Sequence, residues 1–249
     1  MKDNIWEDPK RYSPDSISKS LMSEAESYSD SLQRIKLNTL TNILPQGLVV
    51  DLGCADGRHL RELSKRYTFG VGIDSSLQFL RYGNGKLNGD ENFSLIAADL
   101  SQIPIASSSV DLVYSFNTLY YLQNIGDVYQ EIARILKPSG VAIIEVGNCR
   151  SLSTLIASST ENVAQHAKVN YSEHLNLMAI ANLKVRSIRS FQILPMWGRL
   201  PHFDWLIRSN FLERTMMGSL KGKSVDERVS SFRLLRKQAF RHLVYCGLE

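Results

Sequence analysis

Short apolar runs alternate with amphipathic stretches through the middle of the 249-residue chain. The apolar runs are rich in Val, Ile and Leu and cover residues 48–53, 69–74, 93–100, 110–116 and 141–147. The stretches between them repeat apolar residues at helical intervals over 58–67, 77–87 and 127–136. Continuous apolar strands separated by helices are typical of a parallel sheet that is covered on both faces and joined by right-handed crossovers. The pattern therefore predicts a doubly wound α/β sheet over residues 47–147.

Both flanks of this region have patterns of their own. Leu32, Ile35, Leu40 and Ile43 recur at helical intervals and predict a helix over residues 24–44. The downstream pattern predicts a helix over 171–183 with Ser172 as its cap, a strand over 184–194, a helix over 226–242 and a strand over 242–248.

The chain divides into four segments on this interpretation. We expect an N-terminal arm and lid helix (1–46), an α/β core (47–194), a helical cap insertion (195–241) and a last core strand (242–249). The cap insertion is richer in aromatic residues than the segments before it, which suits a cover over a binding site.

Composition fits an ordinary globular protein and excludes several other classes. Hydrophobic residues make up 43% of the chain and charged residues 22%, which excludes wholesale disorder and collagen-like repeats. The three cysteines, Cys54, Cys149 and Cys246, lie far apart without a CxxC pair, so we expect neither a disulfide framework nor a metal site. The N-terminus is polar, and no apolar run approaches the roughly 20 residues of a membrane helix. We therefore expect a cytoplasmic protein.

Charge is distributed unevenly along the chain. Acidic residues outnumber basic ones by four over residues 1–183, whereas basic residues outnumber acidic ones by eight over residues 184–249. The basic last quarter indicates a separate face with its own partner, although a solvated helical surface has the same charge pattern.

Two motifs place candidate ligand contacts at the ends of the first two strands. In VVDLGCADGRHL (49–60), Gly53 allows a tight turn and Gly57 lets a helix start close to the strand. Together they bring backbone N–H groups and a helix N-terminus to a ligand, although a purely structural turn has the same pattern. Asp74 ends the second strand about 20 residues later, where a carboxylate accepts both hydroxyls of a ribose or, with Ser75, caps the next helix. The two motifs together indicate an adenosine-type ligand.

Further motifs follow in the order of a known family. Residues 94–122 hold a strand-terminal Asp99, an Ile-Pro-Ile loop and a strand that opens Val-Asp-Leu-Val, and LKPSG (136–140) precedes the fifth strand. With these motifs, residues 28–147 resemble the class I S-adenosylmethionine-dependent methyltransferases of type 11, a group that includes ubiquinone and menaquinone C-methyltransferases. Ala55 stands where the first motif of that family more often has glycine. The resemblance implies a Rossmann-like, seven-stranded sheet of strand order 3-2-1-4-5-7-6, with an antiparallel last strand and a helical C-terminal cap insertion.

The resemblance also implies which residues bind S-adenosylmethionine. Asp51 would face the methionine ammonium, Asp74 the ribose hydroxyls, and Asp99 the adenine amino group. Phe116 and Asn117, just after the fourth strand, would close over the sulfonium. The full implied set is Asp51, Gly53, Cys54, Ala55, Gly57, Asp74, Ser75, Leu77, Asp99, Leu100, Phe116 and Asn117. Each of these residues has an alternative role as a strand-end cap or a core residue.

The implied activity is the in-line transfer of a methyl group from S-adenosylmethionine, in which the protein aligns the acceptor and excludes water. We expect O- or C-methylation of a small-molecule, glycan or carrier-linked acceptor. The fourth strand lacks the Asn/Asp-Pro-Pro-aromatic ending of similar enzymes that methylate nucleobases, which argues against DNA as the acceptor. A non-catalytic, methyltransferase-like interaction subunit is the main alternative. A nicotinamide-dependent oxidoreductase is disfavoured because G-x-G-x-x-G is absent.

Acceptor-binding residues are predicted mainly in the cap insertion. Trp197 would exclude water, Arg199 and Arg208 would pair with a phosphate or carboxylate, and His202 is the candidate general base. The full candidate set is Tyr120, Tyr121, Glu145, Trp197, Arg199, His202 and Arg208, and Glu145 is alternatively a buried capping group. We therefore expect an anionic acceptor. The protein itself is expected to be a monomer or homodimer. A dimer contact or peripheral contact with a membrane surface is the alternative for the same cap residues.

Overall fold

The core of the protein is a seven-stranded mixed sheet. A computed structural model of the chain describes residues 28–43, 45–86, 92–157, 169–194, 215–220 and 222–248. The sheet strands are β1 (Leu48–Leu52), β2 (Phe69–Asp74), β3 (Phe93–Ala97), β4 (Val110–Ser115), β5 (Leu136–Gly147), β6 (Leu183–Phe191) and β9 (Arg241–Leu248). Their order is β3-β2-β1-β4-β5-β9-β6, which confirms the predicted order because β9 is the last strand in the chain.

Strand direction also agrees with the prediction. The neighbours among β1 to β5 pair in parallel, and β9 pairs antiparallel with both β5 and β6. Val244 and Cys246 in β9 are completely buried, as expected for a strand inserted between two others. A separate short hairpin, β7 (Ser219–Leu220) and β8 (Lys223–Ser224), was not predicted.

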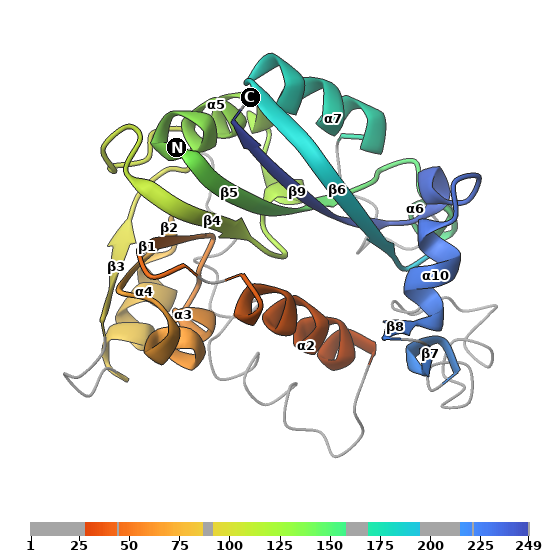
Figure 1. Cartoon of the computed structure of the whole chain (residues 1–249), viewed down its shortest axis with the longest axis horizontal. Helices are drawn as coiled ribbons and strands as arrows, with labels where there is room; N and C mark the ends of the chain where they lie inside the picture. The colour runs from red at the N-terminus through yellow and green to blue at the C-terminus, as the bar shows by residue number, and fades with distance from the viewer. Residues whose placement is uncertain are drawn as a thin grey trace.

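Helices cover both faces of the sheet (Figure 1). The α-helices are α2 (Tyr28–Thr41), α3 (Arg58–Leu63), α4 (Leu77–Asn84), α5 (Ile125–Ile135), α6 (Leu152–Ala157), α7 (Tyr171–Ile180) and α10 (Val225–Ser231). Single 3₁₀ turns are η2 (Ser64–Arg66), η3 (Leu119–Tyr121) and η4 (Arg236–Gln238). Figure 1 shows α5 and α7 on one face, and α2 on the other together with α3 and α4.

Each face has its own apolar core. On one face, Ile132 of α5 and Met178 of α7 pack with Val50 in a cluster of buried residues. On the other face, Leu40 of α2 and Leu60 of α3 belong to a second buried cluster. This two-sided burial explains why the strands read as continuous apolar runs in the sequence.

Three local predictions are wrong. The helix predicted over 226–242 ends at Ser231, because Phe232 and Leu234 beyond it are exposed and offer no buried face to support further turns. The N-cap of α7 is Asn170, whose side chain accepts the Glu173 N–H, in place of Ser172. The LKPSG turn lies inside β5, where the pairing with β4 shifts register between Val110 and Leu112.

The arrangement gathers several chain segments at one edge of the sheet. The carboxyl ends of the parallel strands lie there, and so does the first residue of antiparallel β9, because Arg241 pairs with Gly147 at the end of β5. Lys36 of α2 reaches the same edge through its contact with Glu145 of β5. This edge is where ligands bind in open α/β sheets. Among the described residues, no helix has the length and apolar character needed to cross a membrane.

Candidate cofactor site and its polar network

The turn after β1 has a backbone that few residues other than glycine adopt. Gly53, Ala55 and Gly57 have φ angles of 76°, 49° and 69°. The Gly53 and Cys54 N–H groups both donate to the Ile73 carbonyl, at 2.7 and 3.2 Å, which ties the turn to β2. A Cβ atom at Gly53 would lie 2.2 Å from the side chain of Thr118. Glycine is therefore required here by close packing as well as by the left-handed conformation.

Asp74 joins the glycine turn to the start of α4. Its Oδ2 accepts the Ala55 N–H at 2.8 Å, and its Oδ1 accepts the Ser76 N–H at 2.9 Å. Ser76, one residue after the predicted Ser75, caps α4 by accepting the Phe79 N–H. Each carboxylate oxygen has two lone pairs, so an oxygen that accepts one N–H can accept a ligand hydroxyl as well.

Asp51 is a buried carboxyl group close to the glycine turn. It is 2% exposed, and its Oδ2 has no hydrogen-bond partner among the described residues. Burial raises the pKa of Asp51 to about 8; the nearby Tyr114 hydroxyl opposes this rise, and the charges of Asp74 and Asp56 add to it. A cationic group beside Oδ2 would satisfy the orphaned oxygen and favour the ionised carboxylate.

The remaining predicted cofactor residues lie along the same edge. Asp99 follows β3 and is exposed, and its Oδ1 accepts both the N–H and the hydroxyl of Ser101 at 2.8 Å. Ser75 is exposed and Leu77 is half exposed, whereas Leu100 and Cys54 are buried. Burial raises the pKa of the Cys54 thiol well above its usual range, so this thiol is protonated at neutral pH.

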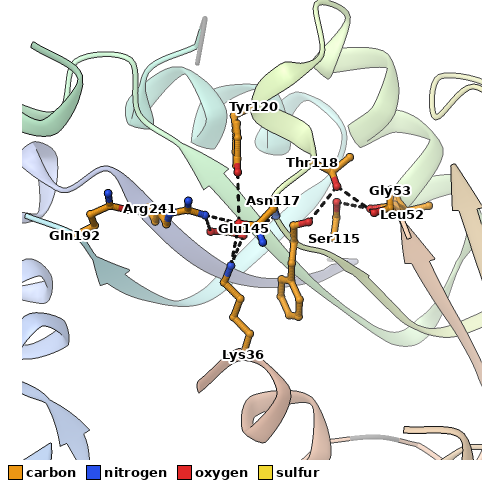
Figure 2. A network of polar contacts seen from close by, with 11 residues as sticks. Lys36, Leu52, Gly53, Ser115, Asn117, Thr118, Tyr120, Glu145, Gln192 and Arg241 are labelled. Carbon is orange, nitrogen blue, oxygen red and sulfur yellow. Dashed lines mark hydrogen bonds and ion pairs between the residues drawn. The ribbon is translucent and has the colours of Figure 1, made fainter. Parts of the chain in front are cut away.

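A buried polar network occupies the end of β4, next to this turn (Figure 2). Glu145 Oε2 accepts from Lys36 Nζ at 2.8 Å and from the Asn117 N–H at 2.7 Å, and its Oε1 accepts from Arg241 at 2.6 Å. The Asn117 side-chain carbonyl accepts from Lys36 at 3.2 Å, from the Tyr120 hydroxyl at 3.4 Å and from Arg241. Four segments therefore meet at one carboxylate and one amide: α2, the turn after β4, β5 and β9.

The charges in this network perturb one another strongly. Burial would raise the pKa of Glu145, but Lys36 and Arg241 outweigh it and lower the pKa to about 2. Burial lowers the pKa of Lys36 to about 8, against the attraction of Glu145. At neutral pH the network therefore holds one carboxylate and two cations.

The structure separates the predicted acceptor residues into two groups. Tyr120 is buried and bonded to Asn117, and the contacts of Glu145 are those of a buried cap, so a contact of either residue with an acceptor stays a prediction. The side chain of Tyr121 and residues Trp197, Arg199, His202 and Arg208 lie outside the described part of the molecule. Within the described residues, no three His, Cys, Asp or Glu side chains are grouped to hold a metal ion.

Sequence reasoning missed Lys36 and Arg241. Lys36 stands four residues from both Leu32 and Leu40, on the apolar stripe of its helix, and a lone charge on such a stripe is the pattern that could have identified it. Arg241 opens an apolar strand, which is a weaker indication.

Comparison with known proteins gives one family for the central region. Residues 50–144 match a family model described as "Methyltransferase domain". A malonyl-[acyl-carrier protein] O-methyltransferase of Marinomonas sp. (strain MWYL1) is 26% identical over 174 residues, which cover 68% of this chain and 61% of that protein. The first three curated relatives are matched over 33% to 61% of their own lengths, so the chain spans only part of each.

Solved structures share the fold across more of the chain. Geranyl diphosphate C-methyltransferase from Streptomyces coelicolor A3(2) has a TM-score of 0.60 at 16% identity, covering 92% of this chain and 86% of that one. The [4+2]-cyclase SpnF has a TM-score of 0.61 at 12% identity, covering 88% and 81%. Since one of these proteins is named as a cyclase, the shared fold alone does not assign a reaction.

Proposed function

We propose that the chain transfers a methyl group from S-adenosylmethionine to an oxygen or carbon atom of a carrier-linked or small-molecule acceptor, as its match to the methyltransferase family model over residues 50–144 suggests. The observation that carries the proposal is the buried Asp51 carboxyl with its unpartnered Oδ2. It lies beside a glycine turn that leaves no room for a side chain at Gly53.

The chain's own residues suit the three parts of the cofactor. Asp51 would hold the methionine ammonium, whose positive charge matches the orphaned oxygen. Asp74 would accept the ribose hydroxyls while it keeps its bonds to Ala55 and Ser76. Asp99 would accept the adenine amino group, with Leu77 against the ring.

When bound, S-adenosylmethionine supplies a methyl group on a positively charged sulfur, which leaves as a neutral thioether. The protein then has to align the acceptor atom with the methyl group and exclude water. Phe116 and Asn117 follow β4 directly and would form the wall nearest the sulfur. The fixed position of Asn117, bonded through both its N–H and its side chain, suits that role.

A carrier-linked acceptor is supported by the surface that precedes β9. In the turn 232–238, Phe232 is 59% and Leu234 79% exposed, beside the exposed Arg233 and Lys237. The turn leads within a few residues to Arg241 at the site. An acidic carrier would find both apolar contacts and complementary charge there, and the likeness to malonyl-[acyl-carrier protein] O-methyltransferases agrees with that chemistry.

The test is transfer of a labelled methyl group from S-adenosylmethionine. Two acceptors are compared: malonyl-loaded acyl carrier protein, and the same malonyl thioester on a small thiol. Arg233→Glu with Lys237→Glu should raise the KM for the carrier-linked form by about tenfold, as for loss of rim charges, and leave the small thioester unaffected. If neither acceptor is labelled, the carrier-linked assignment is wrong. If the chain binds the cofactor but methylates no member of a broader acceptor panel, a non-catalytic subunit is favoured.

A further inference from the structure

Lys36 is a charged residue buried inside the protein. It is 2% exposed, although its helix begins the described part of the chain. Its ammonium lies 2.8 Å from Glu145 and 5.5 Å from the centre of the Phe116 ring. A buried charge is stable only when it is paired, so the docking of α2 and the position of Glu145 depend on each other.

Glu145 fixes the backbone of the residue that follows β4. Asn117 has a φ of 57°, a left-handed conformation that a residue other than glycine keeps only when its surroundings hold it. Its N–H donates to Glu145 at 2.7 Å. Its side-chain carbonyl accepts from Lys36, Arg241 and Tyr120, three donors from three different elements.

The next residue carries this constraint to the glycine turn. The Thr118 hydroxyl lies 3.0 Å from the Phe116 carbonyl and 3.3 Å from the Gly53 carbonyl, and its side chain fills the space that a Cβ at Gly53 would need. Figure 2 shows the path from Lys36 through Glu145 and Asn117 to Thr118 and Gly53. A polar chain therefore runs from α2 to the turn that would hold the cofactor.

We propose that Lys36 is a positioning residue for the cofactor site: its ion pair with Glu145 holds the Asn117–Thr118 corner against the glycine turn, so that the cofactor binds tightly only while α2 is docked. This proposal rests on the proposed function. It concerns the geometry at Gly53 and not a contact between Lys36 and the cofactor.

Two hydrogen bonds hold α2 at residues other than Asn117 and Glu145. Tyr28 donates to Asp226 of α10 at 2.6 Å, and the Thr39 hydroxyl accepts from Arg189 of β6 at 2.7 Å. Asp226 also accepts from the Gln192 N–H and the Ser230 hydroxyl, so it stays hydrogen-bonded without Tyr28. Tyr28→Phe therefore removes one hydrogen bond of α2 but leaves the helix docked through Lys36 and Thr39, which makes it the matched control.

The charge on Lys36 gives the experiment a pH dependence. The groups that face Lys36 are Glu145 of β5, Arg241 of β9, His59 of α3 and the side chain of Asn117. Burial lowers the pKa of Lys36 to about 8, so the proton is largely present at pH 7 and mostly lost at pH 8.5. Arginine at this position would keep its charge throughout this range.

The experiment measures the dissociation constant of S-adenosylhomocysteine by calorimetry for the wild type, Lys36→Met, Lys36→Arg and Tyr28→Phe. At pH 7, Lys36→Met should weaken binding by about tenfold, the effect of one lost charge-assisted hydrogen bond, whereas Tyr28→Phe should change it less than about twofold. From pH 7 to 8.5, the ratio of the wild-type constant to the Lys36→Arg constant should rise by about threefold, since the form with neutral Lys36 binds about tenfold more weakly. Taking this ratio cancels the titration of Asp51 and of the ligand amine.

The outcomes separate the two proposals. Absence of binding by the folded wild type would refute the proposed cofactor function and this inference with it. Normal wild-type binding with an unchanged constant for Lys36→Met, or with equal losses for Lys36→Met and Tyr28→Phe, would overturn the positioning role alone. Thermal melting checks that each variant is folded, and if Lys36→Met does not fold, the pH-dependent ratio with Lys36→Arg decides the question.

Discussion

Replacing Asp51 with Asn removes a buried carboxyl group whose Oδ2 has no hydrogen-bond partner among the described residues. Its pKa of about 8 means that most of the ligand-free chains carry a neutral Asp51 at pH 7. An ammonium group beside Oδ2 favours the ionised form, so cofactor binding should expel that proton. We predict a net release of up to about one proton per S-adenosylhomocysteine bound at pH 7.

The assay is titration calorimetry in buffers of different ionisation enthalpy, where the apparent binding enthalpy changes in proportion to the protons released. Lys36 is already largely protonated at pH 7 and adds an uptake of no more than about 0.1 proton. Asp51→Asn should abolish the buffer dependence and weaken binding, because an amide does not neutralise an ammonium. Buffer-independent enthalpy in the wild type, or equal release by wild type and Asp51→Asn, would refute this reasoning.

Two further predictions test the packing around the site. Gly53→Ala should destabilise the fold by about 2 kcal/mol and weaken cofactor binding, since it adds a side chain at φ 76° against Thr118. In the control Gly222→Ala, which has the same φ but nothing within 4 Å, the free energy of unfolding should fall by only about 1 kcal/mol and cofactor binding should be unchanged. Equal effects of the two substitutions in denaturant melts and calorimetry would contradict the packing argument. Burial lowers the pKa of His242 to about 3, so the unfolded chain binds one more proton than the folded chain as pH falls below about 6.5, and stability drops by about 1.4 kcal/mol per pH unit from this residue. His242→Gln should therefore flatten the fall in stability between pH 6 and 4.5 by that slope, and an unchanged slope would show that His242 is not the group that titrates.

The sheet could be predicted because its strands are buried on both faces. Such strands appear as continuous apolar runs, and the positions of Gly53 and Asp74 at strand ends follow from those runs. The network around Glu145 could not be predicted in this way. Lys36 precedes Glu145 by 109 residues and Arg241 follows it by 96, and no local pattern encodes a pairing over such distances.

The prediction of a helix over residues 226–242 was wrong where tertiary contacts outweighed the local periodicity of apolar residues. Helix α10 ends at Ser231, and the Ser231 and Ser230 hydroxyls accept the Ser190 and Ile193 N–H groups of the edge strand and its end. Those contacts fix the helix against β6, and the apolar residues after it do not continue a buried face. The part of the predicted helix over residues 232–238 is therefore a largely exposed turn in the structure.

The most direct test of the central claim is the affinity of the chain for S-adenosylhomocysteine before and after removal of the ribose carboxylate. We predict micromolar binding by the wild type, no measurable binding of NAD, and a loss of at least about tenfold in Asp74→Ala. Asp74→Asn keeps one acceptor oxygen for the Ala55 or Ser76 N–H. Its affinity for S-adenosylhomocysteine should therefore lie between those of the wild type and Asp74→Ala. Unchanged affinity in Asp74→Ala, or NAD bound as tightly as S-adenosylhomocysteine, would contradict the account.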